Sequence, residues 1–344
     1  MFAEDVGVIW GQLRATRHAP PGAATNDDLR RRAYVSALEQ AEQLFHAASV
    51  VGPAARPLPL FYGLSQAGRA IAAASGRLAG DRWQLRSHGI GCADLDGELS
   101  DVKLNIQGKP GGAGSFIRLS EVLDSPLWSD CAVTLGPLWD TLPMNFTSPI
   151  GPDTHQRRTS LELAGPELFQ TQHPLLTATV YQIPVWVAMS VTPREALMDY
   201  FASFPGAAAH ESYSTVRGDP GRAPDFGRHV DQGWGFLSVN WSVKGGTPAT
   251  VDERQVFMDA ITLPYLGQRW LFPDISGANK PIHPLMAWWA VLFALSMLAR
   301  YQPAEWLSHV DVDASACAVS LERLLTSALA TVPALVIETI QNLD

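Results

Sequence analysis

Hydrophobic and polar residues follow a helical period in the first quarter of the chain. In residues 27–48 the apolar positions recur at steps of three and four, and Asn26 can cap the start of this segment. Residues 58–76 carry a second apolar stripe, made of Leu60, Leu64 and Ile71. The pattern therefore predicts two amphipathic helices, joined by a loop that contains proline and glycine.

Between residues 83 and 245 the helical period gives way to short apolar runs separated by glycine, proline and aspartate. Such runs are typical of strands joined by turns. We expect one helix at residues 193–204 and strands at residues 83–87, 102–107, 115–119, 132–135, 160–163, 177–191 (broken by Pro184) and 235–243. Because strands and helices do not alternate regularly, the sheet is predicted to be mainly antiparallel.

The last quarter of the chain returns to helical patterns. We expect helices at residues 252–262, 284–301, 315–330 and 335–343, with Pro333 separating the last two. Residues 284–299 are almost wholly apolar, but this length falls short of the roughly 20 residues that cross a bilayer. A helix buried inside the protein accounts for this segment, so a soluble chain with no membrane partner is predicted.

The terminal helices cannot each bury an apolar face alone, so we expect them to pack on one another. The sequence therefore predicts an α+β fold, in which N- and C-terminal helices pack together and a mainly antiparallel, β-rich region lies between them in sequence. The expected parts are an N-terminal helical part at 1–80, a β-rich middle region at 81–250 and a C-terminal helical part at 251–344.

Charge and cysteine content narrow the range of functions. The formal net charge is −9, which disfavours binding to the phosphates of nucleic acid, and the three arginines at 30–32 are interpreted as a solvated helix face. Cys92, Cys131 and Cys317 are far apart and odd in number, so neither a disulfide framework nor a zinc site is expected. Residues 1–5 do not begin a signal peptide, and we expect a cytoplasmic protein without metal or cofactor.

Two stretches carry a resemblance to a known family. The first is RPLPLFYGLSQAGRAI at 56–71, and the second runs from LPYLG at 263–267 through IHPL at 282–285 to LFALSMLARYQPAEW at 292–306. The second is the more specific, since LARYxPxxW joins an apolar helix to its proline stop. In these stretches the chain resembles the YaaC-like family of bacterial proteins. The resemblance implies a bacterial intracellular protein, and it carries over neither an activity nor a catalytic residue.

Two motifs point to enzymes, and each has a simpler interpretation. The sequence GLSQA around Ser65 is close to the GxSxG elbow of hydrolases, but the apolar stripe through this segment has a helical period. Arg82 with His88, and Arg222 with His229, match the spacing of the arginine and histidine of HEPN ribonucleases. Neither pair lies in a predicted helix, and two matches are no more than chance gives.

Two loops resemble ligand-binding motifs only in part. The sequence KPGGAGS at 109–115 lacks the lysine position of a Walker A loop, and we expect a hairpin loop followed by a strand. The acidic residues at 94–101 lack the glycine and glutamate positions of an EF-hand, and they are interpreted as a solvated turn.

Arg69 and Arg300 are the most informative polar residues, because each lies on or at the end of a strongly apolar helix. A guanidinium keeps its proton, so burial requires a carboxylate, carbonyl groups or a bound anion as partner. Arg69 also shares a predicted helix face with Tyr62 and Gln66, at positions i, i+4 and i+7.

Three interpretations of these arginines stay open. They form a structural ion pair, through Glu305 or Asp259; they line an anion pocket where the helices meet, with His283 nearby; or they extend to solvent. The candidate ligand-binding residues are Tyr62, Gln66, Arg69, His283 and Arg300.

The sequence thus predicts an intracellular protein of unknown activity that binds a protein partner or a small anionic ligand. The alternatives are an enzyme acting on nucleic acid, of the HEPN-like ribonuclease type, and a serine hydrolase.

Overall fold

The computed structural model describes residues 6–128, 132–151, 157–219 and 221–343. Residues 1–5 and Cys131, which entered the predictions above, lie outside this set. The chain divides into two compact units: unit 1 comprises residues 1–139, 148–152 and 282–344, and unit 2 comprises residues 140–147 and 153–281. These units do not coincide with the three predicted parts, since residues 81–139 belong to unit 1 and residues 251–281 to unit 2.

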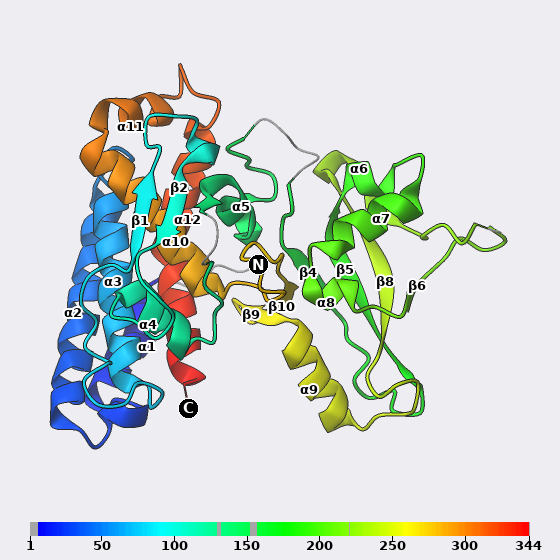
Figure 1. Ribbon diagram of the computed structural model, residues 1–344, viewed down its shortest axis with the longest axis horizontal. Helices are drawn as coiled ribbons and strands as arrows, with labels where there is room; N and C mark the ends of the chain where they lie inside the picture. Colours follow the sequence, from blue (N-terminus) through cyan, green and yellow to red (C-terminus); the bar gives the residue numbers. More distant parts are fainter. Residues whose placement is uncertain (1–5, 129–131, 152–156, 220, 344) are drawn as a thin grey trace. The chain divides into compact units, whose positions relative to one another are not determined.

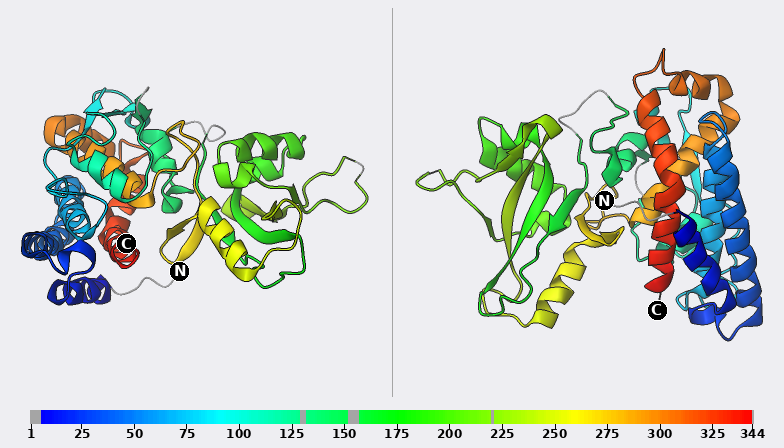
Figure 2. Two further views of the ribbon diagram at one scale, coloured as in Figure 1. Left: turned by 60° about the horizontal axis from the view of Figure 1, so that its bottom comes forward. Right: turned by 180° about the vertical axis from the view of Figure 1, so that it is seen from behind.

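Unit 1 is a bundle of helices with a small antiparallel sheet. Its helices are α1 (Val6–His18), α2 (Asp28–Val50), α3 (Pro57–Ala74), α4 (Ser115–Val122), α10 (Pro284–Tyr301), α11 (Pro303–Val310), α12 (Ala318–Gln341) and most of α5 (Leu135–Asp140). The sheet has the order β1 (Ile90–Ala93), β2 (Lys103–Ile106) and β3 (Val133–Thr134). Helices α2 and α3 lie side by side, and α10 and α12 pack against α3 (Figures 1 and 2). The predicted packing of N- and C-terminal helices is confirmed.

The helix boundaries follow from local chemistry. Asp27 caps α2, because its carboxylate accepts hydrogen bonds from the backbone N–H groups of Leu29 and Arg30; the cap is therefore one residue later than the predicted Asn26. Helix α10 has Pro284 at its first position, where the missing N–H costs nothing. Both α10 and α12 are long and apolar enough to cross a membrane, but 78% and 61% of their apolar windows are buried inside the protein.

A glycine sets the distance between α3 and α10. A Cβ atom added at Gly68 would lie 2.5 Å from a ring carbon of Trp289 and 3.1 Å from a methyl carbon of Leu119. Any side chain at position 68 would push α10 and α4 away, because the indole of Trp289 is fully buried. Gly68 therefore allows the close approach of the two helices that carry Arg69 and Arg300.

Three expectations for unit 1 are corrected. Residues 83–87 form turns and bends instead of a strand, and residues 115–119 form the first part of α4. The short apolar run at 115–119 was misleading, because α4 is buried on most sides and shows no polar face of helical period. Pro333 lies inside a continuous α12, where buried apolar residues on both sides hold the helix together despite the lost hydrogen bond.

Unit 2 is built on a seven-stranded antiparallel sheet, counted over the described residues. The strands run in the order β6 (Ser212–Tyr213), β8 (Trp234–Ser242), β5 (Leu175–Pro184), β4 (Leu161–Ala164), β10 (Gln268–Leu271) and β9 (Leu263–Tyr265), and β7 (Gly227–His229) also pairs with β8. The helices of this unit are α6 (Val185–Ala188), α7 (Pro193–Ala202), α8 (Pro205–Ala208) and α9 (Val251–Ile261).

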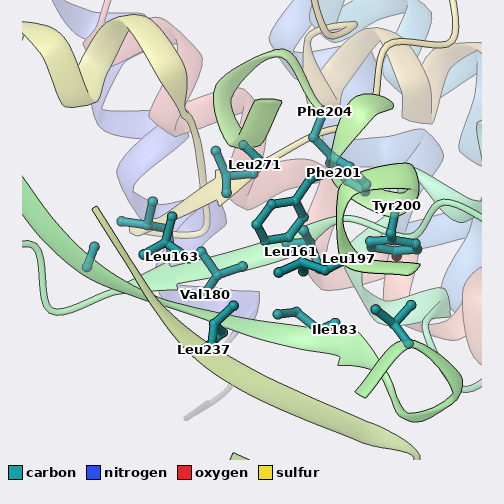
Figure 3. Packing of buried hydrophobic residues seen from close by; sticks show 14 of the residues in the cluster. Leu161, Leu163, Val180, Ile183, Leu197, Tyr200, Phe201, Phe204, Leu237 and Leu271 are labelled. Atoms are coloured by element: carbon teal, nitrogen blue, oxygen red, sulfur yellow. The ribbon is translucent and has the colours of Figure 1, made fainter. Parts of the chain in front are cut away.

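The core of unit 2 lies between one face of this sheet and its helices. Alternate residues of β5 and β8 are buried, so each strand has one face towards the core. Figure 3 shows Leu197, Tyr200 and Phe201 of α7 packed with Val180 of β5 and Leu237 of β8. Helical and antiparallel β-regions in one chain confirm the predicted α+β fold class.

Candidate functional site

Helix α3 presents three polar side chains on the face that the sequence predicts. Tyr62 and Arg69 are exposed and Gln66 is half-buried, whereas Leu60 and Leu64 are fully buried. Residues four and seven positions apart lie on the same side of a helix, so a hydroxyl, an amide and a guanidinium follow one another along the surface of α3.

Arg300, in the last turn of α10, meets this polar face. Its Nη1 donates a hydrogen bond of 3.1 Å to the hydroxyl oxygen of Tyr62. Its guanidinium carbon lies 4.9 Å from the ring centroid of Tyr301, within the range of a cation–π interaction. Because the Tyr62 oxygen accepts the bond from Arg300, the Tyr62 O–H remains available as a donor.

His88 joins these residues from the loop that precedes β1. Its ring centroid lies 5.8 Å from that of Phe61 on α3 and 5.6 Å from that of Phe293 on α10. His88 as a whole is exposed, but these rings keep water from part of the imidazole. The pKa of His88 is lowered from 6.5 first by this burial, then by the charge of Arg300 and then by that of Arg69. His88 is therefore neutral at pH 7, and both arginines act on it.

A close backbone contact holds the His88 loop in place. The Phe116 N–H, at the start of α4, donates a hydrogen bond of 2.9 Å to the His88 carbonyl. Gly89 has a φ of +74°, and a Cβ atom added at Gly114 would lie 2.2 Å from the Gly89 Cα. The glycine-rich segment 109–115 therefore lets two backbone segments touch, and it leads into a helix where we had expected a strand.

We refer to Tyr62, Arg69, His88 and Arg300 as the arginine–histidine cluster. Among the described residues, neither arginine of the cluster forms a salt bridge, and Arg69 forms no hydrogen bond. Other arginines of this acidic chain do have carboxylate partners, as in Arg14–Glu42, Arg17–Glu39, Arg82–Glu121, Arg157–Asp140, Arg158–Asp199 and Arg269–Asp259. The cluster therefore offers positive charge and hydrogen-bond donors without an acidic partner.

His283 does not belong to this cluster. It caps the start of α10, where its Nδ1 accepts a hydrogen bond of 3.2 Å from the Leu285 N–H, and its backbone N–H donates to the Ser125 hydroxyl oxygen at 3.1 Å. Burial lowers the pKa of His283 to about 4, so it is neutral. Arg300 lies at the opposite end of α10, about 26 Å away along the helix axis. The predicted proximity of His283 to Arg300 is wrong, because the two residues lie at opposite ends of one helix.

The buried arginines are different from those expected. Arg69 and Arg300 are exposed, whereas Arg30 is 7% exposed and Arg254 is fully buried. Both buried guanidinium groups donate to backbone carbonyl oxygens, three for Arg30 and four for Arg254. The ion-pair interpretation of Arg69 and Arg300 is not supported, and Asp259 forms its salt bridge with Arg269, at 2.7 Å.

A comparison with protein families decides the relationship that the sequence suggested. The model of the YaaC-like protein family matches residues 16–340. The chain belongs to the YaaC-like family. The match covers all four residues of the arginine–histidine cluster and most of both units of this YaaC-like protein. No curated protein and no solved structure matches it.

The enzyme motifs of this YaaC-like chain find structural explanations. Ser65 lies in the middle of α3, as the helical period predicts, and not on a strand-to-helix turn. Arg82 is paired with Glu121 and lies in a turn, and Arg222, with a φ of +51°, lies in a loop. Within the described residues, no group of three or more His, Cys, Asp or Glu side chains could hold a metal ion.

The sequence predicts that some of these residues share a helix face, but it does not place His88 beside them. Tyr62, Gln66 and Arg69 share a face because of local helical geometry, and Arg300 ends a recognisable helix. His88 entered only through its spacing from Arg82, which does not describe its surroundings. Its position depends on loop packing that no local pattern records.

Proposed function

We propose that this YaaC-like protein binds a small anion at the arginine–histidine cluster. The observation that carries the proposal is the absence of any carboxylate partner for Arg69 and Arg300 among the described residues. Two positive charges near one imidazole repel each other, and they do so in a chain that carries 34 acidic against 25 basic residues. A bound anion would offset this repulsion and accept the unused N–H and O–H groups.

The chemistry of the cluster favours an anion over other ligands. The guanidinium groups of Arg69 and Arg300 are donors only, and the Tyr62 hydroxyl has already used one acceptor position for Arg300. Neutral His88 can donate one N–H to the same ligand. An oxyanion with several oxygen atoms, such as phosphate, matches this set of donors.

A titration with inorganic phosphate at pH 7, followed by calorimetry, tests this proposal. A hydrogen bond to a charged group contributes about 1.5–3 kcal/mol, so Arg69→Gln and Arg300→Gln should each weaken binding by roughly tenfold or more. Arg32→Gln is the matched control, because Arg32 is an exposed arginine of unit 1 outside the cluster. Absence of phosphate binding, or equal weakening by all three variants, would refute the proposal.

A further inference from the structure

Two exposed tyrosines flank Arg300. The residue exposure is 38% for Tyr62 and 53% for Tyr301, although tyrosine rings are largely apolar. Tyr62 accepts the hydrogen bond of Arg300, and the Arg300 guanidinium lies over the Tyr301 ring at 4.9 Å. Positive charge and uncovered aromatic surface are therefore adjacent on the same end of α10.

A bare inorganic anion uses only part of this surface. Phosphate would engage the guanidinium, imidazole and hydroxyl donors, but it makes no use of an aromatic ring. Exposed aromatic rings beside arginine side chains are the groups on which proteins stack nucleobases, while the cations bind the phosphate. The Arg300 guanidinium covers one face of the Tyr301 ring. A base that stacks here needs only one open face, either the other face of the ring or the outer side of the guanidinium plane.

We infer that the anion bound at this cluster is the phosphate group of a mononucleotide, whose base stacks against Tyr301. This inference rests on the proposed function and adds the class of ligand to it. Arg69, Arg300 and the Tyr62 hydroxyl bind the phosphate oxygens. The base adds affinity that phosphate and sugar alone do not have. The cluster is small and the chain has a net charge of −9, which favours a single nucleotide over a nucleic-acid strand.

Three ligands separate this inference from the proposed function: inorganic phosphate, ribose 5-phosphate and adenosine 5′-monophosphate. We expect the wild-type protein to bind the nucleotide about tenfold more tightly than ribose 5-phosphate, the usual scale for one stacked base. Equal affinity for these two ligands would overturn the inference and leave the proposed function intact. Failure of all three to bind would overturn both. Binding of a single-stranded oligonucleotide without binding of the mononucleotide would also overturn the inference.

Substitution of Tyr301 tests where the base lies. Tyr301→Leu should remove the tenfold preference for the nucleotide over ribose 5-phosphate, because both ligands carry the same phosphate and only the nucleotide carries a base that can stack. Tyr301→Phe is the matched control, since it keeps the ring and should keep the preference. Thermal melting of both variants monitors folding. A preference that survives Tyr301→Leu would refute stacking on this residue.

Discussion

The side chain of Arg30 provides a direct test of how unit 1 is held together. This buried guanidinium donates to three carbonyl oxygens at and beyond the end of α3, those of Ala73 at 3.2 Å, Ser75 at 2.8 Å and Leu78 at 2.7 Å. It also lies 5.3 Å from the ring centroid of Trp83. The last carbonyl groups of a helix have no partner within the helix, so Arg30 supplies donors that α3 itself lacks.

The substitution Arg30→Met keeps a long, unbranched side chain and removes all of these donors. A buried carbonyl that loses its partner costs about 1–3 kcal/mol, and three such groups set an upper range of roughly 3–9 kcal/mol. Water that reaches the carbonyls, together with the removal of a buried charge, offsets part of this cost. We therefore expect a loss of about 3–5 kcal/mol, in the lower part of this range.

Urea unfolding followed by tryptophan fluorescence and circular dichroism measures this loss. Arg32→Met is the control, because Arg32 lies on the same helix but is exposed, and exposed substitutions usually change stability by less than about 0.5 kcal/mol. Arg30→Lys should recover only part of the stability, since one ammonium group does not have the planar fork of the guanidinium. A loss below about 1 kcal/mol for Arg30→Met would refute this account of Arg30.

Three further predictions concern the arginine–histidine cluster and helix α3. Gly114→Ala should destabilise the protein in thermal melting and weaken phosphate binding, because the new Cβ atom would collide with the Gly89 backbone and displace His88. Phosphate should raise the pKa of His88 in an NMR titration, because an anion offsets the arginine charges that lower it; an unchanged pKa would place the anion elsewhere. Ser65 should not react with a fluorophosphonate, and labelling that disappears in Ser65→Ala would contradict its position inside α3.

Local patterns predicted most elements but not the environment of individual side chains. The shared face of Tyr62 and Arg69 follows from helical geometry alone, so the sequence was sufficient to predict it. The run of arginines at 30–32 shows the limit, since it was interpreted as a solvated face. Arg31 and Arg32 are exposed, but Arg30 turns inward to the end of α3. Which of three adjacent arginines is buried depends on a helix that follows later in the chain.

The errors in secondary structure have the same origin. Residues 115–119 were predicted as a strand because their apolar positions showed no polar face of helical period. In the structure, packing against α3 and α10 buries most sides of α4, which removes the pattern that identifies a surface helix. Pro333 was expected to end a helix, but burial of residues such as Val332 and Val336 outweighs one missing hydrogen bond.

The order of the chain in unit 1 has a consequence for its synthesis. Helices α2 and α3 leave the ribosome first, but their partners α10 and α12 come after residue 282, on the far side of unit 2. At roughly 5–20 residues per second, the interval between residues 139 and 282 lasts roughly 7–30 s. During that time unit 2 can complete its fold, whereas α3 has α2 and α4 beside it but still lacks α10 and α12. Nascent unit 1 therefore exposes the part of its apolar surface that α10 and α12 cover, until those two helices have been synthesised.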